Sequence, residues 1–213
     1  MVAVITTMME FDEPSLVAAL GQLPQRHRVA FASSCAERLM PAYQAFSRQS
    51  GIGDATALRA TLDRLWDDLA GNVMTDTELQ REINRSMKLI PPDDEGTTVP
   101  YAAAAEDAAS ALAFALRCRQ SGRSQEAARS AGRAYEALDA YVINREDIDT
   151  SAPGGEARVL AHPLIQTEFA RQQQDLADLS RDGVLGNVAP RLRARANIES
   201  ASFFGALPDS DGV

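Results

Sequence analysis

The stretch YAAAAEDAASALAFALRCRQSGRSQEAARSAGRAYEALDAYV, residues 101–142, decides the fold. Residues at alternating spacings of four and three occupy its first half: Tyr101, Ala105, Ala108, Leu112 and Ala115. The same kind of spacing follows the Gly122 turn: Ala128, Ala131, Tyr135, Leu138 and Val142. Such spacing marks one face of a helix. The stretch therefore predicts an antiparallel helical hairpin, in which the many alanines let the two backbones approach closely.

Helical periodicity also runs through the sequence on both sides of this hairpin. Further helices are expected over residues 14–23, 24–46, 54–71, 75–90, 163–181 and about 188–200. The only strand-like run is Val2 to Ile5, which is too short to found a sheet. We therefore expect an all-α, single-domain helical bundle of about eight helices with a central Ala-rich antiparallel helical hairpin.

Capping residues, prolines and glycines set the expected limits of these helices. Asp54 is expected to cap one helix, and Thr75 with Glu78 fits a capping box at the start of the next. Pro41 lies inside a helical pattern and should kink or break it. Residues 145–161 contain Pro153 and two glycines without a clear period, which predicts a long loop.

The length of 213 residues suits one domain. We expect an N-terminal extension over residues 1–12, a single all-helical domain over 13–200, and a flexible C-terminal tail over 201–213. The N-terminus has no basic segment before its short apolar run, so no signal peptide is expected. A cytoplasmic location is the resulting expectation.

The charge and the cysteine and histidine content of the chain limit the kinds of partner that are expected. The net charge is −9, with a pI near 4.8. An acidic surface repels nucleic acids and anionic membranes, so neither is expected as a partner. Cys35 and Cys118 lie in separate helical segments and are expected to be free, packed thiols. No Cys/His cluster has the spacing of a zinc site, so no metal is expected.

The order of the helical segments resembles a bacterial family. Four stretches carry the resemblance: AFASSCAERLMPAYQAFSRQSGIGD (30–54), ALRATLDRLWDDL (57–69), YAAAAEDAASALAFAL (101–116) and HPLIQTEFARQQ (162–173). They are similar to the YjaG-like proteins, known as domain of unknown function 416. The resemblance implies an all-helical fold and supplies no reaction. After Ala194 the sequence departs from the family's pattern.

No nucleotide-binding or catalytic motif is present, so no cofactor and no catalytic residue is assigned. One candidate binding site is a pocket between the second, third and penultimate helices that gathers Glu37, Asp63, Asp107 and His162. Two of these residues have a structural alternative. His162 precedes Pro163 and can bond the free amides of a helix start. Glu106 and Asp107 are either a buried acid pair with raised pKa values, suited to proton chemistry, or acids that the hairpin seam leaves at its edges.

Arginines gather near the tip of the hairpin and form a second candidate site. Arg119 and Arg123 are its central members, and an anion or an acidic partner is the expected ligand. The alternative is that these cations complement the helix dipole while nearby acids dilute the patch. The run Arg191, Arg193, Arg195 alternates by two, which predicts side chains splayed around a solvated terminus.

Two functional classes follow. The leading hypothesis is a non-enzymatic cytosolic protein that acts by protein–protein binding, with a homodimer or an immunity- or antitoxin-like acidic protein as its particular forms. The alternative is a small-molecule-binding protein or enzyme whose pocket is lined by acidic residues and a histidine. The first rests on the lack of catalytic motifs and on the acidic charge.

Overall fold

The computed structural model describes residues 8–91, 101–181 and 183–204, with side chains as far as residue 198. Its nine described helices are α1 (Glu13–Gly21), α2 (Gln25–Ser50), α3 (Ala55–Ala70), α4 (Asp76–Lys88), α5 (Ala102–Ser121), α6 (Ser124–Glu146), α7 (Gly155–Leu160), α8 (Pro163–Arg181) and α9 (Leu185–Phe204). These ranges contain no strand. The all-α class is confirmed, and the helix beyond the expected eight is α7, in the predicted loop.

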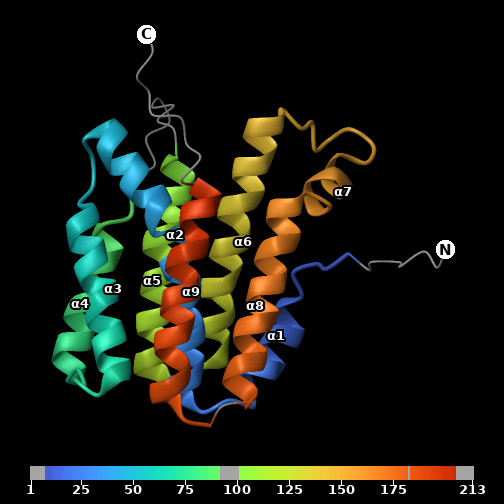
Figure 1. The fold of residues 1–213 in the computed structure, drawn as a ribbon. Coiled ribbons are helices and arrows are strands. Elements are labelled where there is room, and N and C mark those ends of the chain that lie inside the picture. Colours follow the sequence, from blue (N-terminus) through green and yellow to red (C-terminus); the bar gives the residue numbers. More distant parts are fainter. Residues whose placement is uncertain (1–7, 92–100, 182, 205–213) are drawn as a thin grey trace.

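Helix α2 is the centre of the bundle. It packs most extensively on α5 and also contacts α3, α6, α8 and α9. Figure 1 shows α3 and α4 on one side of α2, α5, α6 and α9, and α1, α7 and α8 on the other. The core is one continuous cluster that runs through all of these elements, so the described helices form a single packed unit.

The Ala-rich hairpin is confirmed as α5 and α6. Gly122 joins the two helices at a φ of 71°, a left-handed conformation that costs glycine little. Small residues allow a close meeting with α2, because Ser130 Oγ lies 3.0 Å from the Ala32 carbonyl oxygen and 3.1 Å from that of Ala111. One hydroxyl thus contacts backbone from α2 and α5 where three helices meet.

The predicted caps are confirmed. The Asp54 carboxylate accepts a 2.8 Å hydrogen bond from the Ala57 amide at the start of α3. Thr75 and Glu78 form the reciprocal capping box of α4. Both devices satisfy amides that have no partner inside the helix.

Pro41 does not break its helix, so of the two predicted outcomes, a kink or a break, the break does not occur. Helix α2 continues from Gln25 to Ser50 through Pro41. The missing amide removes one backbone hydrogen bond, while buried side chains on both sides of Pro41 keep the helix packed in the core. The last helix, expected from about residue 188, begins at Leu185.

Both ends of the described chain extend the helical bundle. Residues 8–12 lie against the bundle, where Phe11 stacks on Tyr135 with ring centroids 5.7 Å apart. Helix α9 extends to Phe204, into the expected tail. Val2 to Ile5 and residues 92–100 lie outside the described residues. In the part that is described, no helix combines the length and apolar character needed to cross a membrane.

Candidate functional site

Glu37 and Asp63, two of the predicted pocket residues, are brought together by arginines. Glu37 is fully buried on α2 and accepts hydrogen bonds from Trp66 Nε1 at 2.7 Å and Arg59 Nη2 at 2.9 Å. Arg59 also pairs with Asp63 at 2.9 Å, and Arg193 of α9 pairs with Asp63. These contacts tie α2, α3 and α9 together. Both carboxylates are neutralised, which gives them a structural role.

The neighbouring Arg38 enters a second buried network, with α8. Its guanidinium grips Glu168 through two hydrogen bonds, Nε to Oε2 at 3.0 Å and Nη2 to Oε1 at 2.9 Å. Its Nη1 donates to Asp175 at 2.9 Å and to Ser34 Oγ at 2.8 Å. Arg38, Glu168 and Asp175 are at most 2% exposed. Paired, hydrogen-bonded charge is the form in which ions persist in a core.

Arg193 and Arg195 of α9 take part in both networks. The prediction that these side chains are splayed around a solvated terminus was therefore wrong for these two residues. Arg195 pairs with Asp175 and, at 2.8 Å, with Asp178 of α8. Arg193 reaches Asp63 and lies over the Trp66 ring, 5.8 Å from its centroid. Spacing by two places these arginines on different sides of the helix. Because α9 packs against both α3 and α8, each side meets acids.

Asp107 is buried, so the prediction that it lies at the edge of the seam was wrong. It is 7% exposed on α5, while its neighbour Glu106 is exposed. Arg133 Nη1 donates to its carboxylate at 3.2 Å. Burial raises the pKa of Asp107 to about 7, and the Arg133 charge opposes that rise only in part. A carboxyl that titrates near neutrality is the main perturbed acid of the hairpin.

The effect of Asp107→Asn on the free energy of unfolding, relative to wild type, should be more favourable at pH 7.5 than at pH 4.5. The folded pKa lies above the unfolded value, so the native state holds the proton more tightly, and wild-type stability falls as the pH rises from about 4 to 7. Asparagine does not titrate, so the variant should lack this decrease in stability. Urea denaturation across this pH range measures the free energy of unfolding of both proteins. Glu106→Gln, at an exposed neighbouring position, is the control. If Asp107→Asn instead lost stability relative to wild type as the pH rises over this interval, the raised pKa of Asp107 would be contradicted.

His162 serves as a helix cap, as its structural alternative predicted. Its Nδ1 accepts a 3.2 Å hydrogen bond from the Leu164 amide at the start of α8. None of the described contacts links His162 or Asp107 to Glu37 and Asp63. The four residues therefore do not form one pocket: Glu37 and Asp63 share Arg59, while Asp107 and His162 each lie in a separate contact.

The arginines at the hairpin tip are largely neutralised. Arg119 binds Asp68 through Nε at 2.7 Å and Nη2 at 3.2 Å, and Asp68 is 1% exposed. Arg129 pairs with Glu126 at 3.4 Å. Arg123 is exposed at the start of α6. The described surface thus favours the dipole and ion-pair interpretation of this patch over an anion site.

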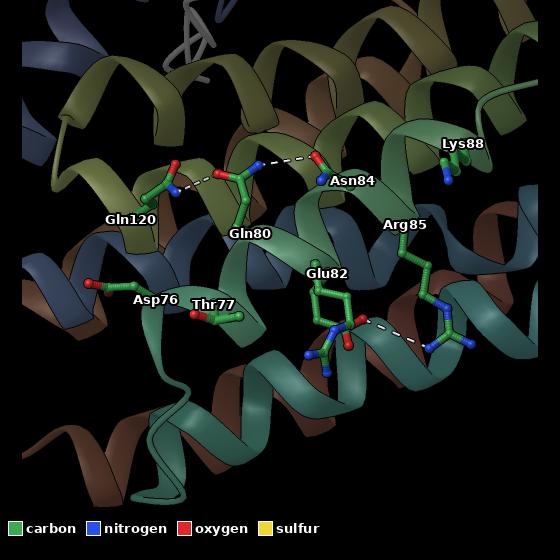
Figure 2. A pocket seen from close by; sticks show the side chains of 9 residues that line it. Asp76, Thr77, Gln80, Glu82, Asn84, Arg85, Lys88 and Gln120 are labelled. Atoms are coloured by element: carbon green, nitrogen blue, oxygen red, sulfur yellow. Dashed lines mark hydrogen bonds and ion pairs between the residues drawn. The ribbon is translucent and has the colours of Figure 1, made fainter.

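A groove that the sequence analysis missed lies between α4 and the end of α5. It has a volume of about 870 Å³ and is open to solvent on the described surface. Its lining is almost wholly polar: Asp76, Thr77, Gln80, Arg81, Glu82, Asn84, Arg85, Lys88 and Gln120. Figure 2 shows the amides of Gln120, Gln80 and Asn84 in a row, joined by hydrogen bonds of 3.0 Å.

Three cations line up along this groove. Arg81, Arg85 and Lys88 follow at spacings of four and three, which places them on one face of α4. Arg85 has a long 3.9 Å ion pair with Glu82. Arg81 and Lys88 form no ion pair within the described residues, and Lys88 is the only lysine in the sequence. The periodicity was visible in the sequence, but the recess was not.

The fold and the buried networks define an all-helical bundle. Its described residues contain no group of three or more His, Cys, Asp or Glu side chains that could hold a metal ion. The chain belongs to the family described as Protein of unknown function (DUF416), whose model matches residues 15–205. It is similar to a crystal structure of a DUF416 family protein from Shewanella baltica OS155, with 20% identity and a TM-score of 0.76. That match covers 87% of this chain and 94% of the other. No curated protein matches the chain.

Proposed function

We propose that this chain is a non-enzymatic, cytosolic protein that binds an acidic segment of a protein partner in the groove along α4. One observation carries the proposal: a polar hollow of about 870 Å³ exposes Arg81 and Lys88 without ion-pair partners among the described residues. The chain as a whole is strongly acidic, so this cationic stripe is a local exception. Local charge of this kind selects partners of opposite sign.

The hydrogen-bonding groups of the groove suit a peptide backbone. Gln80, Asn84 and Gln120 offer amide donors and acceptors in a row along its length (Figure 2). A peptide presents the same two kinds of group along its backbone. Carboxylates of the partner would meet Arg81, Arg85 and Lys88 through charge-assisted hydrogen bonds, which are stronger than neutral ones.

The buried acids support a binding role over an acid–base enzyme. Glu37 is fully buried against Arg59 and Trp66, which leaves it without a path to a substrate. Asp107 is paired with Arg133. General acid–base groups need access to a reacting proton within hydrogen-bonding distance. The antitoxin-like form of the hypothesis requires an acidic surface, so this groove gives it no support.

Lys88 provides a direct test, because it is the only side-chain amine in the chain. A carbodiimide joins an amine to a nearby carboxylate with loss of water. Treating the complex captured from host cells should yield an amide between Lys88 and an acidic residue of the partner, mapped by mass spectrometry. Lys88→Arg keeps the charge and should abolish the cross-link while leaving affinity unchanged.

Charge reversal measures the contribution of the stripe. Lys88→Glu combined with Arg81→Glu should weaken binding of the purified partner by about tenfold or more, since like charges then meet in the groove. Arg158→Glu on α7 is the matched control, because it makes the same kind of change on an exposed site across the bundle (Figure 1). Unchanged affinity in the double variant would refute the proposal, as would capture that disappears on nuclease treatment.

A further inference from the structure

A second hollow lies between residues 10–19 and α8. These elements are on the opposite side of the bundle from α4 (Figure 1). Its volume is about 270 Å³, slightly below the range of roughly 300–1,000 Å³ for pockets that bind drug-sized ligands. Its body is apolar: Phe11, Leu16, Ala19, Phe169 and Leu176 line it. A compact apolar group would be removed from water there.

Two specific contacts hold the outer wall of this hollow in place. Gln166 of α8 clasps the backbone of Met9, because its Oε1 accepts from the Met9 amide at 2.9 Å and its Nε2 donates to the Met9 carbonyl at 2.8 Å. Phe11 stacks on Tyr135, whose ring lies 5.3 Å from that of Phe169. The wall is therefore preformed, which lowers the entropic cost of binding a ligand.

Gln172 is the most deeply placed of the polar residues that line the hollow, which also include Glu10, Asp12, Ser15 and Gln173. It lines the hollow and is only 5% exposed. Both hydrogens of its amide nitrogen are used, by the Ala131 carbonyl at 3.2 Å and by Glu168 Oε1 at 2.9 Å. No donor to its Oε1 occurs among the described residues. Because Gln172 lines the hollow, this oxygen can accept a hydrogen bond from a ligand that carries an N–H or O–H group.

The charges at the rim select among such ligands. Glu10 and Asp12 are exposed at the edge of the hollow, and its described lining contains no arginine or lysine. A cationic donor is attracted to this edge, whereas a carboxylate is repelled. We propose that the hollow between residues 10–19 and α8 binds a compact amine with an aromatic or aliphatic body, the ammonium group lying toward Gln172 and the acidic rim.

Phenethylamine is a suitable probe, since it joins one aromatic ring to one amine through a short chain. An NMR titration of the full chain should shift the amide signals of Leu16, Ala19 and Leu176, and the side-chain amide of Gln172. Phenethyl alcohol should bind more weakly and phenylacetate more weakly still, because they replace the cation with a neutral donor and an anion. Equal affinity for phenylacetate would overturn the proposal, as would shifts confined to other surfaces.

A pair of adjacent substitutions separates filling the hollow from a general effect on α1. Ala19 lines the hollow, whereas Ala18 is exposed on the same helix and does not. Ala19→Leu should weaken phenethylamine binding about tenfold or more, a loss of about 1.4 kcal/mol, and Ala18→Leu should leave it unchanged. Equal effects of the two changes would refute the site. Lys88→Glu should not alter this binding, so failure here is distinguishable from failure of the proposed function.

Discussion

Replacing Arg38 with Met should reduce the free energy of unfolding by about 3–5 kcal/mol, the cost typical of removing one partner from a buried ion pair. Glu168 and Asp175 are each 1% exposed, and Arg38 makes ion pairs with both. Without it, Glu168 retains only Gln172 as a described side-chain donor, while Asp175 retains Ser34 and Arg195. A buried negative charge would then be poorly compensated.

Urea denaturation followed by circular dichroism measures this loss. Arg64→Met is the matched control, because Arg64 has a long 3.7 Å pair with Glu78 at a partly exposed site. Pairs of that kind contribute about 0–1 kcal/mol. Adding Glu168→Gln to Arg38→Met should recover part of the loss by removing one unpaired charge. Equal effects of the Arg38 and Arg64 changes would show that the buried network adds nothing special.

Replacing Ala109 with Leu should destabilise the protein by about 1–3 kcal/mol or more, because the larger side chain has no space in a filled core. Ala109 is fully buried on α5, the helix that packs most extensively on α2. Leucine is nearly as good a helix former as alanine. Any loss therefore reports the closeness of the helices rather than the propensity of α5.

Ala103→Leu is the control for this change, since Ala103 is exposed on the same helix. It should alter the unfolding free energy by no more than about 0.5 kcal/mol. The midpoint of urea denaturation compares the two variants. If Ala109→Leu were neutral, the small residues of the hairpin would not set the distance between α5 and its neighbours.

Local signals made most of the fold predictable. The spacing of the hairpin residues, the Asp54 cap and the Thr75–Glu78 capping box are all short-range patterns, and the structure contains each of them. Local signals were insufficient where tertiary packing decides the outcome. Pro41 remains inside a continuous helix whose buried side chains are held by the core. The short helix α7 carries too few residues to show a period.

The candidate sites were less predictable because they depend on pairs that are distant in sequence. The sequence predicts a solvated Arg193, yet Arg193 pairs with Asp63, 130 residues earlier. Asp107 and Glu106 are adjacent and differ only in which side of α5 they occupy. The basic stripe of α4 has a readable period, but only the position of α5 turns it into a groove.

The Arg38 network also has a consequence for how the chain folds as it is made. Its carboxylates are separated from Arg38 by 130 and 137 residues. Ribosomes add residues from the N-terminus, so α2 leaves the exit tunnel long before α8 exists. During that interval Arg38 has neither of its final acidic partners, and burying it would be unfavourable. Productive closure of the core around α2 is therefore a late event, completed only as the C-terminal helices emerge.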